Sequence, residues 1–409
     1  MMRQRIKTKR TSYTLAFCAL CLVALSFLYA PSCHAEGKSD RFTKKMPDVP
    51  YFNEEAFKEK TKVYKKRPYG DDSLAYKINI PDDWEQGAEK GTSNAQISDK
   101  LFLDLNIYYG PPRMGGRSRV EIQAVNMDYD FTAEQWYLKY ILESGYTLEG
   151  FVVDNDRKIE SLMVIMEDDI SYYVRTVAQI NGKKMILARY LLPVPYWQEE
   201  APMQASVMRS FTLINDIHEQ IGKYKKFQFL DVAELQYPET WDVVAGKMAS
   251  VERMNAKFVN ISKTGDDVSG HAPSKNDAIS SLAEGHVDVN LIMAASASSL
   301  IREIQNYKKK LESTGILVGK KLDIEPDFHY HKNVSFFISE VYEGTDSSRD
   351  YTSYELWFTV MVAGNYFYFM TLLTPSETEN FVAWAKNVRG YRKIVESLLP
   401  TTGAYLERQ

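Results

Sequence analysis

The sequence contains a pair of predicted aromatic β-hairpins, one in each half, and any fold for this chain has to accommodate both. The first, residues 172–192, turns at Asn181 and Gly182, and the second, residues 356–373, turns at residues 363–365. Asn-Gly between two runs rich in β-branched and aromatic residues is a strong hairpin signal, and both of its residues are expected to have positive φ. The return strands are apolar on both faces, so each is predicted to be a central strand covered on two sides.

A second recurring feature is a strand that ends in Pro-x-x-Trp. Residues 74–80 lead into Pro81 and Trp84, and residues 229–237 lead into Pro238 and Trp241. Proline stops a β-ladder, and a tryptophan three residues later can fold back onto the sheet. Trp84 and Trp241 are therefore predicted to be equivalent buried anchors.

A third recurring feature is a strand followed by a helix that ends at glycine. Thr132 and Gln135 form a predicted capping box for a helix over 133–144. The second copy is predicted to have a helix over 299–313. Gly145 and Gly315 stand where C-terminal caps are expected.

Each hairpin is also followed by a predicted terminal helix. In the first copy this helix lies near 202–211. In the second copy Ser376 and Glu379 are expected to cap a helix that breaks at Gly390.

These recurrences predict an α+β fold made of two tandem copies of an antiparallel sheet sandwiched by helices. Residues 74–214 and 228–400 are expected to share one strand order. The predicted divisions are a signal segment 1–35, a charged leader or spacer 36–73, a first domain 74–217, a linker 218–227, a second domain 228–400 and a tail 401–409.

On these motifs, each copy resembles the PsbP-like fold, an α/β/α sandwich. This fold is shared by the photosystem II extrinsic protein, the yeast Ran-release factor Mog and exported bacterial lipoproteins of the DcrB type. Eag chaperones of type VI secretion resemble it too, and their paired copies hold apolar effector segments. None of the matching features is a catalytic motif. The resemblance implies a binding or accessory factor rather than an enzyme.

The N-terminus has the order of a secretory signal. Basic residues from Arg3 to Arg10 precede an apolar run over residues 13–29, and Pro31 and a small-residue site follow. Cleavage after Ala35 predicts a periplasmic or secreted protein. The alternatives are lipidation at Cys33 and a membrane anchor retained through residues 13–29.

Composition and the absence of known motifs argue against several classes of function. All three cysteines lie at or before Cys33, so a chain cleaved after Ala35 has no thiol nucleophile and no disulfide. Without the five basic residues of the signal, 45 Lys and Arg stand against 54 Asp and Glu, a formal charge of −9. A moderately acidic exported chain is not expected to bind nucleic acid. The sequence carries no phosphate loop, dinucleotide fingerprint, nucleophile elbow or zinc-protease motif.

One cluster has the residue types of a metal site. Glu325, Asp327, His329 and His331 alternate along the sequence, so a strand there would place all four side chains on one face. The alternative is a solvated edge strand, since Pro326 keeps such a strand at the edge of a sheet. No cofactor is expected.

The leading functional hypothesis is an exported, non-catalytic binding, scaffold or chaperone-like protein of the cell envelope. Its two domains would form a pseudo-dimer within one chain and hold an envelope protein partner or apolar segment between them. The expected rims are the unequal loops 110–116 and 263–280. The alternatives are a metal-dependent or hydrolytic enzyme using residues 325–331, and a membrane-tethered structural factor.

Overall fold

The computed structural model describes residues 44–87, 92–97, 100–114, 116–245, 250–261, 283–294, 299–346 and 352–401. The expected signal segment, the loop 263–280 and the tail from residue 402 lie outside these ranges. No helix within the described ranges is long and apolar enough to cross a membrane.

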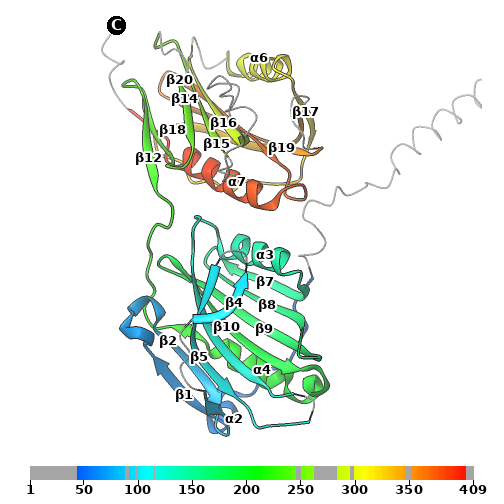
Figure 1. The fold of residues 1–409 in the computed structure, drawn as a ribbon. Helices are drawn as coiled ribbons and strands as arrows, with labels where there is room; N and C mark the ends of the chain where they lie inside the picture. The colour runs from blue at the N-terminus through cyan, green and yellow to red at the C-terminus, as the bar shows by residue number, and fades with distance from the viewer. Residues whose placement is uncertain are drawn as a thin grey trace, which may run out of the picture. The chain divides into compact units, whose positions relative to one another are not determined.

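The first half of the chain, residues 44–217, contains a small sheet of order β1-β2-β11 and a large sheet of order β3-β5-β6-β10-β9-β8-β7, with β4 paired to β5 (Figure 1). Its strands are β1 (Thr61–Lys66), β2 (Tyr76–Pro81), β3 (Glu85–Gln86), β4 (Thr92–Ile97), β5 (Lys100–Tyr109), β6 (Arg119–Asn126), β7 (Thr147–Asn155), β8 (Lys158–Glu167), β9 (Ile170–Asn181), β10 (Lys184–Pro193) and β11 (Thr212–Leu213). Its helices are α2 (Glu54–Glu59), α3 (Ala133–Ser144) and α4 (Trp197–Ser210).

The second half, residues 218–401, contains a small sheet of order β12-β13-β21 and a large sheet of order β14-β15-β16-β20-β19-β18-β17. Its strands are β12 (Tyr224–Phe229), β13 (Ala233–Pro238), β14 (Asp242–Ala245), β15 (Arg253–Ile261), β16 (Ala283–Met293), β17 (Ile316–Lys321), β18 (Val334–Asp346), β19 (Tyr354–Ala363), β20 (Tyr366–Pro375) and β21 (Leu399–Pro400). Its helices are α6 (Leu300–Ser313) and α7 (Phe381–Glu396).

Among the described residues, the two halves have the same strand order in both of their sheets, apart from strand β4 in the first half. Every pair of neighbouring strands in these sheets is antiparallel. The prediction of one shared strand order is confirmed, and the chain is an antiparallel α+β protein.

The predicted hairpins form the centres of the large sheets. Strand β10 lies between β6 and β9, and β20 lies between β16 and β19. Positive φ was expected at both Asn181 and Gly182, and this prediction is wrong for Asn181, which does not have positive φ. Gly182 and the corresponding Gly364 have φ of 57° and 54°. A single positive φ at the first loop residue is the arrangement expected of a type II′ turn.

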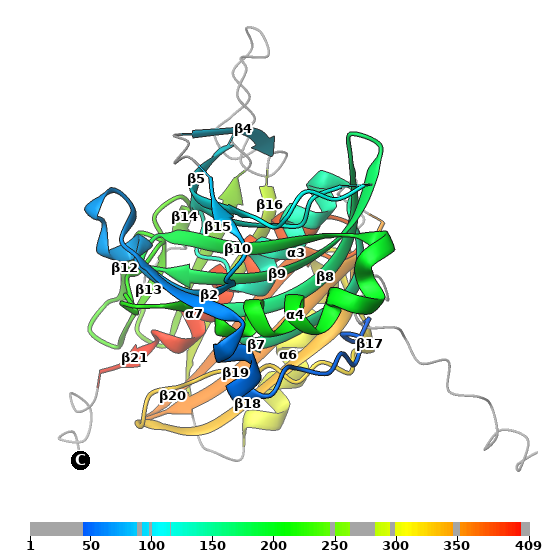
Figure 2. The same ribbon diagram turned by 90° about the horizontal axis from the view of Figure 1, so that it is seen from below.

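Side chains that alternate along β10 and β20 face two different hydrophobic cores. In β10, Ile186 and Ala188 pack towards α4, whereas Met185 and Leu187 pack towards α3. In β20, alternate aromatic and aliphatic side chains likewise face α7 on one side and α6 on the other. Figures 1 and 2 show α4 lying across β9 and β10, as its contacts with these strands require.

The first predicted helix, α3, is confirmed, and both of its ends are capped by the predicted residues. Thr132 accepts a hydrogen bond from the backbone N–H of Gln135, and the Gln135 side chain accepts one from the N–H of Thr132. Gly145 caps the C-terminus with φ of 67°. The capping pair expected for α7 is wrong, because Asn380 accepts a hydrogen bond from Ala383 N–H and the helix begins at Phe381.

Two segments expected to be spacers are partly structured. Thr61–Lys66, placed in the charged leader, forms β1 and pairs with β2, and Tyr224–Phe229, which overlaps the end of the linker, forms β12 and pairs with β13. Both are charged strands at the edge of a small sheet, where Lys side chains can remain in water. Their composition therefore resembles that of a solvated spacer.

Candidate functional site

The two Pro-x-x-Trp motifs form the same turn. The N–H of Trp84 donates to the carbonyl of Pro81 over 3.1 Å, and the N–H of Trp241 donates to the carbonyl of Pro238 over 3.0 Å. Trp84 and Trp241 are only 9% and 5% exposed, as predicted for buried anchors. The Trp84 indole packs on Tyr190 of β10 in the same half, with ring centroids 5.2 Å apart.

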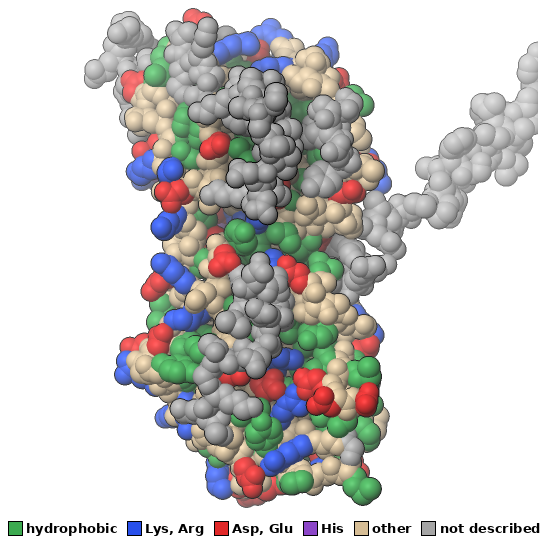
Figure 3. Space-filling view, viewed as in Figure 1, with side chains coloured by type: hydrophobic (Ala, Val, Ile, Leu, Met, Phe, Trp, Pro, Cys, Tyr) green, Lys and Arg blue, Asp and Glu red, His purple; other side chains and the backbone are tan. Residues whose placement is uncertain are grey.

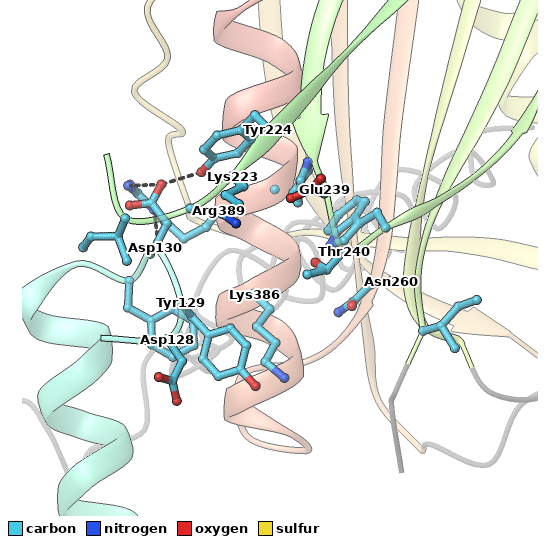
Figure 4. A pocket seen from close by; sticks show the side chains of 17 residues that line it. Asp128, Tyr129, Asp130, Lys223, Tyr224, Glu239, Thr240, Asn260, Lys386 and Arg389 are labelled. Carbon is cyan, nitrogen blue, oxygen red and sulfur yellow. Dashed lines mark hydrogen bonds and ion pairs between the residues drawn. The ribbon is translucent and has the colours of Figure 1, made fainter. Parts of the chain in front are cut away.

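The turn that holds Trp241 also forms part of a cavity of about 450 Å³, and residues from both halves line this cavity (Figure 4). The first half contributes Asp128–Phe131, the loop between β6 and α3. The second half contributes residues 221–224 and 238–241, the end of β15, and Lys386, Arg389 and Gly390 of α7.

A half-buried polar junction lies at one side of the cavity. The Tyr224 hydroxyl donates to Asp130 Oδ2 over 2.5 Å, and Arg389 Nε donates to the Asp130 carbonyl over 2.9 Å. Arg389 Nη2 lies 3.5 Å from Asp130 Oδ2. Burial and the Asp130 carboxylate both raise the pKa of Tyr224, so its hydroxyl remains a hydrogen-bond donor at neutral pH.

Aromatic and cationic side chains meet at the opening of the cavity. Lys386 Nζ lies 4.3 Å from the centroid of the Tyr129 ring, and Figure 4 shows the two side chains side by side. Tyr129 is 41% exposed. Lys393, which does not line the cavity, has its Nζ 4.9 Å from the centroid of the Tyr224 ring. Each cation lies over the negative face of a ring, which restrains the long lysine side chain.

At the wall of the cavity, a buried amide pair that includes the lining residue Asn260 fixes α7 to the large sheet. Asn387 is fully buried and donates to the carbonyl of Glu284 and to Thr374 Oγ1, both over 3.0 Å. Asn260 Nδ2 donates to Asn387 Oδ1 over 2.8 Å. Because these groups satisfy one another, the α7 face that carries Lys386 and Arg389 is held in one position.

The cavity combines apolar surface with charged groups of both signs. Phe131, Ile221 and Trp241 supply the apolar part, while Lys223 and Glu239 supply opposite charges. Aromatic surface beside fixed polar groups is typical of sites that bind a peptide segment or a small ligand.

Sequence reasoning located only part of this cavity. The Pro-x-x-Trp motif indicated the turn 238–241, but no motif marks residues 128–131 or the cations of α7. The one pattern in the sequence that could have indicated these cations is the spacing of positive charges along one face of α7. Any solvated helix face has the same pattern, so it does not identify a binding site.

The four predicted metal ligands do not come together. Residues 322–331 have no regular secondary structure, so the strand that would align the side chains of Glu325, Asp327, His329 and His331 is absent from this described segment. His331 Nδ1 accepts from the N–H of Asn333 instead. The described residues contain no group of three or more His, Cys, Asp or Glu side chains placed to hold a metal ion.

Of the two expected rims, the described residues of the loop 110–116 do not line this cavity. Described residues of the loop 110–116 pack onto their own half: Arg113 pairs with Glu200 of α4, and Tyr196 donates to the carbonyl of Met114. The loop 263–280 lies outside the described residues. Among those described, the rims are Asp128–Phe131 and the turn 238–241.

No family model and no curated protein matches the chain. Among solved structures, cyanobacterial PsbP (CyanoP) from Synechocystis sp. PCC 6803 is 12% identical, with 38% of this chain and 92% of that chain covered at a TM-score of 0.28. A structure from Bacteroides thetaiotaomicron VPI-5482 is 13% identical, with 40% and 53% covered at a TM-score of 0.25. The immunity protein TplEi of T6SS from Pseudomonas aeruginosa is 10% identical, with 80% and 95% covered at a TM-score of 0.18. These values show no family for the chain, and its fold is defined by its own strand order.

Proposed function

We propose that this protein is a non-catalytic binding protein of the cell envelope that captures an extended segment of a protein partner in the cavity lined by both halves. We also propose that the halves are tandem PsbP-like copies, which their common strand order supports. Export to the envelope rests on the N-terminal segment 1–35.

The observation that carries the proposal is the lining of the cavity. An exposed tyrosine, buried apolar side chains and fixed cations line a volume of about 450 Å³. Tyrosine and arginine are enriched among residues that dominate protein interfaces, because they combine large contact area with hydrogen bonding. A peptide segment with alternating apolar and charged side chains matches this lining.

The charge distribution on one face of the molecule favours a specific partner over general electrostatic attraction. On the described part of the face in Figure 3, basic and acidic side chains are interspersed with hydrophobic ones and form no patch of a single sign. Specificity is therefore expected to come from the cavity itself.

Site-specific photo-crosslinking in the native cell tests this proposal. A photoreactive phenylalanine analogue at Tyr129 is expected to give a discrete adduct with one protein. Tyr51 provides a matched control, because it is 46% exposed and carries Arg209 4.7 Å from its ring centroid, but does not line the cavity. Equal adducts from both positions, or no adduct from Tyr129, would contradict the proposal.

A further inference from the structure

A second pocket of about 390 Å³ lies in the second half, between α6 and strands β15 and β16. Its polar lining includes Arg253, Asn255, Asn290, Asn306, Tyr307 and Lys310. This pocket is separate from the cavity of the proposed function, and the inference drawn from it stands or fails independently.

The register of the two sheets identifies the equivalent positions in the first half. Gln123 pairs with the fourth residue of β10, and Asn290 pairs with the fourth residue of β20. Asp104 pairs with Gln123, and Asn255 pairs with Asn290. Asn255 is therefore equivalent to Asp104. Two residues earlier on the same strands, Arg253 is equivalent to Phe102.

The helix ends give the equivalent positions on α3 and α6. Counted back from the glycines of positive φ, Gly145 and Gly315, Tyr307 is equivalent to Tyr137. Both tyrosines are buried, and each hydroxyl hydrogen-bonds to the sheet: Tyr137 with Ser161 over 2.6 Å, and Tyr307 with Asn290 over 3.1 Å. The same count makes Asn306 equivalent to Trp136, and Lys310 equivalent to Tyr140.

In the first half, the three positions hold a buried aromatic cluster. Phe102 lies 6.4 Å from Trp136 and 6.0 Å from Tyr140, and the Trp136 and Tyr140 rings are stacked at 5.7 Å. In the second half, Arg253, Asn306 and Lys310 occupy these positions and are exposed. The positions that are filled by buried aromatic rings in the first half are thus occupied by exposed polar side chains around a pocket in the second half.

The cations of this pocket are available to a ligand. Asp288 is already matched, because it lies 3.3 Å from His286 Nε2 and 3.7 Å from Lys257 Nζ. Within the described ranges, neither Arg253 nor Lys310 forms an ion pair, and Glu303 is the one carboxylate that lines the pocket.

We propose that this pocket binds a small anion that also carries hydroxyl groups, of the class of sugar acids and sugar phosphates. A guanidinium binds carboxylate or phosphate through two parallel hydrogen bonds, and Lys310 adds a second positive charge. The carboxamides of Asn255, Asn290 and Asn306 can both donate to and accept from hydroxyl groups. The volume is in the range of pockets that enclose small molecules.

Calorimetric titration of the purified protein with glucuronate, glucose 6-phosphate and uncharged glucose tests the assignment. Saturable binding of at least one of the two anions is expected, with none for glucose. Arg253→Gln and Lys310→Gln are each expected to weaken that binding about tenfold or more, the loss typical of a charge-assisted hydrogen bond. Lys309→Gln is the matched control, since Lys309 is the neighbouring exposed lysine of α6 and does not line the pocket.

A filled variant tests the copy comparison directly. Asn306→Trp combined with Lys310→Tyr introduces the residues of the first half and is expected to abolish anion binding while the protein remains folded by circular dichroism. The proposal is overturned if neither anion binds, if glucose binds equally well, or if the Arg253 and Lys310 variants bind like Lys309→Gln.

Discussion

Trp241 packs directly against Gly390, and the absent side chain of this glycine leaves the space that the indole ring occupies. This contact joins the Pro-x-x-Trp turn of β13 to the middle of α7, at the base of the cavity. The helix continues through Gly390 without a break, from Phe381 to Glu396. A glycine that sequence reasoning interprets as a helix breaker therefore serves to bring a helix and an indole ring together.

The Gly390 contact predicts an unusual effect of substitution. Alanine at a helix-interior glycine normally stabilises by about 0.5–1 kcal/mol. Here the new methyl group would overlap the Trp241 ring, so Gly390→Ala is expected to lower the free energy of unfolding by about 1–3 kcal/mol. Urea unfolding measures the change. In a Trp241→Ala background the penalty should disappear, and equal losses in both backgrounds would contradict the contact.

The two anchors are predicted to be of similar importance. Trp84→Ala and Trp241→Ala should each cost on the order of 3–5 kcal/mol, as for other large buried aromatics. Urea unfolding of each variant checks this. A loss below about 1 kcal/mol for either one would show that its ring does not anchor the sheet.

Asn181 distinguishes the two hairpin turns. Its buried side chain donates to the carbonyl of Ser73 over 2.8 Å and accepts from the N–H of Ile217 over 2.7 Å, whereas the equivalent position in the second hairpin is Ala363. Asn181→Ala is expected to cost about 1–3 kcal/mol, because it leaves two partly buried backbone groups, the Ser73 carbonyl and the Ile217 N–H, without this partner. Asn181→Asp is a useful comparison, since it retains the acceptor and loses the donor. Unchanged unfolding of Asn181→Ala would mean that the turn is held by its strands alone.

Glu355 predicts how stability depends on pH. The residue is 7% exposed, and its Oε2 accepts from the indole N–H groups of Trp357 and Trp384 over 2.9 and 2.7 Å. Burial raises its pKa above 4.5, against the lowering effect of the hydrogen bonds from the two indoles. The folded state therefore holds the proton more tightly than the unfolded state, so the stability from this group is complete below pH 4.5 and is lost as pH rises through the raised pKa.

The Glu355→Gln variant tests this sign. Gln retains an acceptor for both indoles but cannot titrate, so the loss of stability on raising the pH above 4.5 should be smaller than in the wild type. Glu355→Ala should instead destabilise at every pH, because two buried indole N–H groups lose their acceptor. Parallel pH profiles for the wild type and Glu355→Gln would exclude a raised pKa for Glu355.

The sequence predicted the features that depend on local chemistry or on repetition. The capping box at Thr132, the glycine cap at Gly145 and the central position of the two return strands each follow from short-range patterns, and all three are present. The fold prediction failed where a contact with a residue distant in the sequence determines the local structure. Trp241 changes the role of Gly390, and pairing with β2 turns the charged residues 61–66 into a strand.

The functional positions were harder to predict for a related reason. Tyr129 and Lys386 are far apart in the sequence and belong to no motif, so only the folded chain brings them together. The alternating residues 325–331 look like a ligand set only if they form a strand, and the segment is irregular. Alternation specifies one face only where a strand exists.

A site shared by both halves of the chain should lose affinity when either half is altered, and affinities for the crosslinked partner measure this. Tyr129→Ala changes the first-half wall, and Glu239→Lys reverses a charge on the second-half wall. Each is expected to weaken binding about tenfold or more, as for interface residues that dominate affinity. The controls Tyr51→Ala and Glu312→Lys, at exposed positions that do not line the cavity, should bind as the wild type does. Loss of affinity from variants of only one half would contradict a shared site.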